Sequence, residues 1–336
     1  MQNNATYFKH SICLSLVFLL SGFMLSKILF DGSIASLLLA FILSLVLFLK
    51  CEPDLSVSKN KLINGLFVGL FICFCFICLT VCQNDYIVFI DKIRLPNTLA
   101  VVLSGIFTLL ALYLGRQNEK IIFTFSVFIF IVSVFAIVLL FVFSIPLFDF
   151  KMFVNDLNFD ILKISSGAMR NFAFSFGQLI IIAVFLKQNN RFSVNRILIG
   201  AGFGFVILLI LLLNVVLVLD MEIISQLEYP YPTVSGILTI GRSQSRVDGL
   251  LYFVYFACAL IKSSVIYNVI IKLLRGYKRI FSTITVTAIT ILSVILSASH
   301  QMNDLLNSNP IAIILVVLEI IILFVFITNS LKRRIG

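Results

Sequence analysis

The sequence predicts an all-α membrane protein that crosses the bilayer about ten times. Hydrophobic residues make up 61% of the 336 residues and charged residues only 12%, a balance outside that of soluble domains. The mean hydropathy of +1.14 points the same way. Apolar runs of roughly 20 residues, the length that a bilayer core requires, recur along the whole chain. No polar stretch is long enough for a soluble domain, so residues 1–336 are expected to form a single membrane domain.

Ten apolar runs are candidate spans. The first is too long for a signal-peptide core and lacks a small-residue cleavage site, so a span is the better interpretation. Helices surrounded by lipid and by one another can be apolar on all sides. The ten runs are Ser11–Phe30, Ser33–Leu49, Leu62–Val81, Leu99–Leu114, Ile121–Phe143, Phe172–Leu186, Ile197–Leu219, Leu250–Leu273, Ile280–Ala298 and Ile311–Thr328.

The charged residues predict the orientation. With the N-terminus inside, the cytoplasmic side carries a net charge of +13 and the opposite side a net charge of −3. The positive-inside rule therefore favours cytoplasmic N- and C-termini, with residues 331–336 as a basic tail. Because the excess of basic residues is explained by topology, a nucleic-acid partner is not expected.

The ten spans divide into two halves of five. The longest polar connection follows the fifth span, so residues 1–145 and 172–330 are expected to be inverted repeats joined by an extracellular connection at 146–171. Small residues interrupt the first span of each half, within Leu19–Leu25 and Phe172–Leu179. Broken helices at matching positions free backbone groups for a ligand. The alternative is that their glycines allow close helix packing.

These two interruptions are the expected ligand site. Backbone groups there would hold the carboxylate and amine of a small nutrient, which is expected to be an amino acid. The candidate ligand-binding residues are Ser21, Gly22, Ser175, Phe176, Gly177 and Gln178.

Two ionisable residues lie at mid-depth in their spans. Lys262 follows Asp248 by 14 residues, about 21 Å along a helix, and Glu319 lies well inside the last span. An isolated charge there costs about 2.5–3.5 kcal/mol and usually faces a partner or a cavity. One hypothesis is that the Lys262 ammonium replaces a coupling cation or senses the ligand. The alternatives are a structural Lys262–Glu319 pair and a neutral lysine.

The sequence offers no pattern typical of an enzyme. Walker loops, zinc-ligand spacing and a Ser/His/Asp order are absent from the 336 residues, so no catalytic residue and no cofactor is expected. Cys75, Cys78 and Cys82 share one helix face, but no histidine or carboxylate lies among them, and no metal site is expected.

One stretch, Tyr229–Ser264, carries a family resemblance. It resembles the B subunit of bacterial spore germinant receptors, the spore germination permease family of the amino acid/polyamine/organocation superfamily. In the sixth span, Phe174–Gln178 is similar to that family's Phe-Pro-Phe-Gly-Glu but lacks the proline and the acid. Ser245 stands where a glutamate is usual. The matching elements are Tyr231-Pro232-Thr233, Ile240-Gly241, Ser245-Arg246-Val247-Asp248 and Ile261-Lys262-Ser263-Ser264.

The resemblance implies a ten-helix LeuT-like fold with broken first and sixth helices. It also implies nutrient sensing in the spore inner membrane, with an A-type membrane subunit and a C-type lipoprotein as partners. Arg246 and Asp248 would pass a ligand-driven shift to these partners, although helix capping by itself also explains Asp248. Two alternatives stay open. One is an active transporter of small solutes coupled to protons or sodium, and the other is an assembly subunit with a vestigial pocket.

Overall fold

The computed structural model describes the greater part of the chain. It covers residues 2–23, 34–49, 52–53, 61–93, 99–149, 161–219, 223–224, 227, 229–237, 239–240, 243–244, 247–299 and 309–335.

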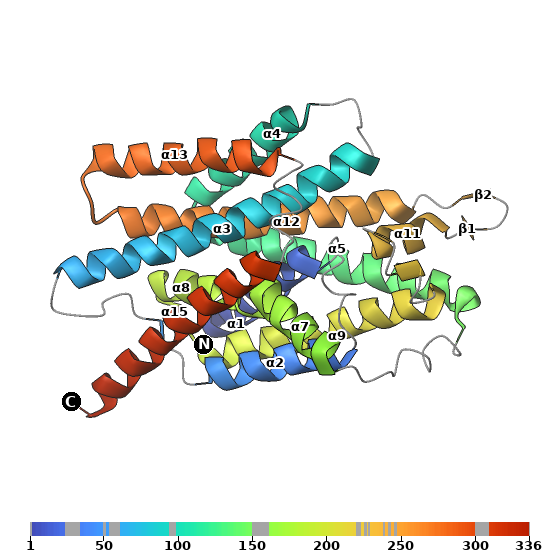
Figure 1. Ribbon diagram of the computed structural model, residues 1–336, viewed down its shortest axis with the longest axis horizontal. Helices are drawn as coiled ribbons and strands as arrows, with labels where there is room; N and C mark the ends of the chain where they lie inside the picture. Colours follow the sequence, from blue (N-terminus) through green and yellow to red (C-terminus); the bar gives the residue numbers. More distant parts are fainter. Residues whose placement is uncertain are drawn as a thin grey trace.

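The described residues are almost entirely helical (Figure 1). The first half contains α1 (Gln2–Phe23), α2 (Ile34–Phe48), α3 (Lys61–Ile93), α4 (Ala100–Arg116), α5 (Glu119–Ser144) and the short 3₁₀ turn η2 (Ile145–Leu147). The second half contains α7 (Ile161–Asn171), the π-helical segment η3 (Phe172–Phe176), α8 (Leu179–Gln188), α9 (Val194–Val218), α11 (Pro230–Ile237), α12 (Val247–Leu274), α13 (Arg279–Ser297) and α15 (Asn309–Ile335). Strands β1 (Thr239–Ile240) and β2 (Ser243–Gln244) form a small antiparallel hairpin in which Thr239 pairs with Gln244.

Each of the ten expected spans coincides with a helix. In the described part of the chain, seven helices are long and apolar enough to cross a membrane. Three shorter apolar stretches lie at Lys9–Ser21, Ile34–Phe48 and Ala100–Arg116. The prediction of an all-helical protein with several membrane spans is confirmed.

Helix α12 lies at the centre of the bundle. It packs against α1, α3, α4, α5 and α8. Figure 1 shows α3 running along it, while α15 lies at an angle to it. Glycines allow close contacts here, since a Cβ on Gly115 of α4 would lie 2.7 Å from the Tyr267 Cβ of α12. By contrast, α13 is largely exposed on the outside of the bundle, as expected of a helix that faces lipid.

Helix α3 is longer than expected. It continues past Val81 through a polar Gln-Asn-Asp sequence to Ile93. Hydropathy ends the span at Val81, but the bundle accepts these polar side chains. The Asn84 side-chain amide donates a hydrogen bond to the Ser297 carbonyl oxygen at 2.9 Å, which satisfies a buried donor.

The sixth helix begins earlier than expected. Its first part, α7, starts at Ile161, within the stretch predicted to be an extracellular connection. α7 is amphipathic: Leu162, Lys163 and Ser166 are exposed, while Ala168 and Asn171 are buried against the bundle. Hydropathy alone misses such a helix because its polar face lowers the average.

Candidate functional site

The sixth helix is interrupted within the expected stretch. In η3 the Gly177 N–H donates to the carbonyl oxygen five residues back, on Phe172, at 2.8 Å. Gly177 and Gln178 then form a turn, and α8 begins at Leu179. The Gln178 side-chain amide donates to the Ala173 carbonyl oxygen at 3.1 Å. Such π segments inside α-helices are frequent at functional sites.

The first helix behaves differently. α1 runs as a regular α-helix through Ser21 and Gly22 to Phe23, and the rest of the expected interruption, residues 24–25, lies outside the described residues. The Ser21 hydroxyl donates to the Phe18 carbonyl oxygen of its own helix at 2.7 Å. The described part of this stretch is therefore uninterrupted, and a break of the first helix beyond Phe23 stays a prediction. α1 nevertheless contacts η3.

Glu319 of α15 lies directly against the break. A Cβ added to Gly177 would lie 2.1 Å from Glu319 Oε2 and 2.6 Å from Oε1. Only glycine allows this approach. Glu319 is fully buried, and neither carboxylate oxygen has a hydrogen-bond partner among the described residues. The Gln178 side-chain oxygen is likewise buried and without a described partner.

Lys262 of α12 is a further buried charged residue that interacts with Glu319. Its side chain is only 3% exposed, and its ammonium lies 5.0 Å from the centre of the Phe18 ring of α1, a cation–π distance. Its charge acts on Glu319 without contacting it, since the Glu319 oxygens accept no hydrogen bond from the described residues. The structural Lys262–Glu319 pair considered from the sequence stays a hypothesis, with an electrostatic interaction but no contact ion pair among the described residues.

Asp85 is an acid of this site that was not identified from the sequence, because hydropathy ends the third span at Val81, before this residue. It lies on α3, and the Lys262 charge acts on it as well. Asp85 in turn acts on Tyr255 of α12, as does Tyr231 of α11. The apolar residues that follow Asp85, Ile87 to Ile90, were the available signal that the helix continues through it.

The remaining family-motif residues lie around the start of α12. Pro232 is buried in α11, which packs against α9 and α12. Asp248 is in the first turn of α12, and Arg246 lies outside the described residues. The neighbouring Tyr231 hydroxyl has no partner in the described part of the chain. Burial raises the pKa of this hydroxyl, so it remains a proton donor.

Charged groups predicted to share the cytoplasmic side are paired with one another. Lys187 lies 3.7 Å from Glu52, and Lys272 lies 3.8 Å from Glu119 and donates to Asn189. These contacts agree with the predicted grouping. The cytoplasmic orientation of that side stays a prediction.

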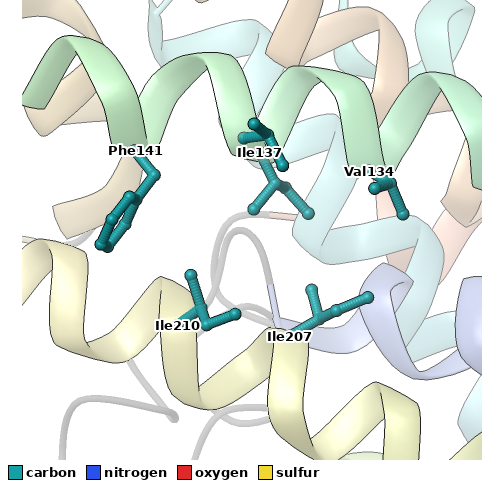
Figure 2. A pocket seen from close by; sticks show the side chains of 6 residues that line it. Val134, Ile137, Phe141, Ile207 and Ile210 are labelled. Carbon is teal, nitrogen blue, oxygen red and sulfur yellow. The ribbon is translucent and has the colours of Figure 1, made fainter.

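The described residues line two apolar cavities, of which the first lies away from the break and the second is lined in part by Phe172 of η3. The cavity in Figure 2, about 240 Å³, is lined by α5 and α9. Its walls are Val134, Ile137, Val138, Phe141, Ile207 and Ile210, and the labelled side chains converge on a space without polar groups. A second, about 280 Å³, lies between α2, α7 and α15. Neither offers the polar groups that fix a polar solute. Within the described ranges, no three His, Cys, Asp or Glu residues are grouped as metal ligands.

Sequence comparisons find no match: no family model fits the chain, and no curated protein is similar to it. The fold is similar to that of a solved Na⁺-coupled sialic acid symporter in its substrate-bound, outward-open state. The TM-score is 0.57 at 13% identity, and the match covers 86% of this chain and 72% of the symporter chain. At this identity the likeness shows the fold alone.

Proposed function

We propose that this chain binds a small solute between α1 and the broken sixth helix and moves it across the membrane with a coupling cation. The observation that carries the proposal is the π segment Phe172–Phe176, which contacts α1 and has Glu319 buried against its end. The similarity of the fold to a Na⁺-coupled symporter supports it.

The solute site comprises Ser21, Gly22, Ser175, Phe176, Gly177 and Gln178. The change of hydrogen-bond register in η3 lets the Ala173 carbonyl oxygen accept from the Gln178 side chain, and the Gln178 side-chain oxygen has no described partner. Such groups suit the amine and carboxylate of an amino acid, because a buried polar site gains most from a ligand that completes its hydrogen bonds.

Lys262 supplies a fixed positive charge beside this site. It touches α1 through the Phe18 ring and acts electrostatically on the acids of α3 and α15. The Lys262 ammonium would occupy the position of one bound cation. The ion that moves together with the solute would be a proton or sodium.

Uptake by the purified full chain in proteoliposomes tests the proposal. A panel of radiolabelled amino acids and sialic acid is offered under a sodium gradient, a pH gradient or no gradient. We expect accumulation of at least one solute only under a gradient. Lys262→Met should abolish accumulation, while the matched control Lys163→Met, at an exposed position of α7, should not. Equal accumulation by Lys262→Met and wild type would remove Lys262 from the mechanism.

A second candidate, nutrient sensing in a spore germinant receptor, is favoured by the motifs in Tyr229–Ser264. Pro232 in α11 packs on the same helix that carries Lys262, so a ligand-driven shift of α12 would reach Asp248 and Arg246 and then an A-type subunit and a lipoprotein. A ligand can drive this only by binding the two states unequally. This candidate places the chain in the spore inner membrane, with both termini in the cytoplasm.

The two candidates give different results. Saturable binding of a labelled amino acid to the proteoliposomes, without accumulation under any gradient, favours sensing. In a spore-forming host, a germination response that changes with this subunit would support sensing directly. A response that stays the same when the subunit is swapped would favour an assembly role with a vestigial pocket.

A further inference from the structure

The Glu319 carboxylate sits where a charge is hard to maintain. It is fully buried within the apolar helix α15, and both oxygens are without a described hydrogen-bond donor. A buried carboxylate without donors pays the full loss of its hydration, so the uncharged acid is favoured over the anion.

The packing around Glu319 leaves room for a proton on the carboxylate but not for a larger ligand on the side that faces Gly177. Both carboxylate oxygens lie so close to Gly177 that even one added carbon would be 2.6 Å or less from either of them. A solute amine or a hydrated metal ion would need space on this side of the carboxylate, whereas a proton needs none.

Among the described residues, the charges around Lys262 also favour one bound proton. Lys262 acts on two acids, Asp85 of α3 and Glu319 of α15. One cation and two carboxylates leave an uncompensated negative charge in a low-dielectric interior, and one bound proton removes it. Asp85 is partly exposed, while Glu319 is fully buried, so Glu319 is the acid that carries the proton.

The other titratable groups in the described part of the chain do not alter this balance. The Cys78 thiol of α3 interacts with Glu319, and Cys82 of α3 interacts with Lys262, but neutral thiols add no charge. η3 contains only Phe, Ala and Ser. On α7, Lys163 is exposed and Arg170 is half-buried, and neither acts on Glu319.

We propose that Glu319 is a proton-binding site and that its protonation state sets the conformation of the broken sixth helix. The protonated acid can remain packed on Gly177. After proton loss the anion needs donors, and it obtains them by approaching Lys262 or by opening η3 so that backbone N–H groups turn toward it. Either response moves the helix that the proposed solute site is built on. The inference rests on the proposed function only for its use in transport, since proton binding needs no solute.

Infrared difference spectroscopy of the full chain in liposomes, titrated with pH, detects the protonated acid directly. We expect a carboxylic-acid C=O band that disappears with rising pH in wild type and is absent from Glu319→Gln. The matched control is Glu52→Gln, because Glu52 is 41% exposed and paired with Lys187; it should keep the band. Lys262→Met should move the midpoint to higher pH by about one unit or more, because the ammonium favours the anion. A titrating band that persists unchanged in Glu319→Gln would overturn the proposal.

Hydrogen exchange of residues 172–178, corrected for the intrinsic effect of pH, tests the coupling. Wild type should lose protection with the same midpoint as the infrared band, while Glu319→Gln should stay protected at every pH and Glu52→Gln should follow wild type. If Glu319→Gln does not fold, agreement of the two wild-type midpoints and their joint shift in Lys262→Met decide the question. Protection independent of pH in wild type would overturn the coupling. Neither measurement involves uptake, so a failure of transport leaves this inference standing, and its own failure leaves sodium-coupled transport open.

Discussion

Helix α1 and the π segment η3 contact each other, but the small-residue stretches of the first and sixth helices differ in their backbones. At Gly177 the α-helix gives way to a π segment and a turn, whereas α1 stays regular through Gly22. Glu319 reaches Gly177 from another helix and occupies the space of a side chain, while Ser21 bonds only to its own helix. Small residues therefore permit a break in a helix. Where the break forms, at Gly177, the side chain of Glu319 from a distant part of the chain packs against it.

Gly177→Ala should show the largest effect, because the new methyl group would overlap the Glu319 carboxylate. Overpacking of this kind costs about 1–3 kcal/mol of unfolding free energy, and sometimes more. Denaturant unfolding in detergent measures the cost. The control is Gly202→Ala on α9, where nothing lies within 4 Å of the added Cβ. The double variant Gly177→Ala/Glu319→Ala should recover part of the loss, since the two positions are in contact. Equal stability of the two single glycine variants would contradict the described packing.

Gln178→Leu should have an intermediate effect. It removes the hydrogen bond to the Ala173 carbonyl oxygen and leaves that acceptor buried in the π segment. We expect a loss of about 1 kcal/mol in unfolding free energy, together with weaker solute binding. If the unfolding free energy is unchanged, and hydrogen exchange becomes faster only outside residues 172–178, then the Gln178–Ala173 hydrogen bond does not stabilise the π segment.

Ser21→Ala should have the smallest effect on stability. Its hydroxyl bonds to a carbonyl oxygen that is already part of the helix, and the loss of such a local bond should change the unfolding free energy by only a few tenths of a kcal/mol. Solute uptake should nevertheless fall, because Ser21 belongs to the proposed site. A loss of unfolding free energy as large as that of Gln178→Leu would mean that the Ser21 hydrogen bond contributes as much to stability as the Gln178 hydrogen bond in the π segment.

The sequence located most of the site but not its geometry. Lys262, Glu319 and Gly177 stand out as charges or small residues in apolar runs. Asp85 was hidden because hydropathy ends a span at the first polar cluster, and α7 was hidden because its Lys163 and Ser166 face lowers its average. Both belong to helices whose polar side chains find partners or an exposed face only once the bundle is formed.

The sequence alone determined the class of the molecule and the helices that make it, because the length and apolarity of a span follow from the thickness and chemistry of the bilayer. It also determined that a buried cation and a buried acid exist. Only the tertiary structure decided that Glu319 lies against Gly177, that Lys262 faces Phe18 and acts on two acids, and that the small-residue stretch of the sixth helix breaks as a π segment. The physical reason is that these features depend on which helices meet, and 142 residues separate Gly177 from Glu319 along the chain.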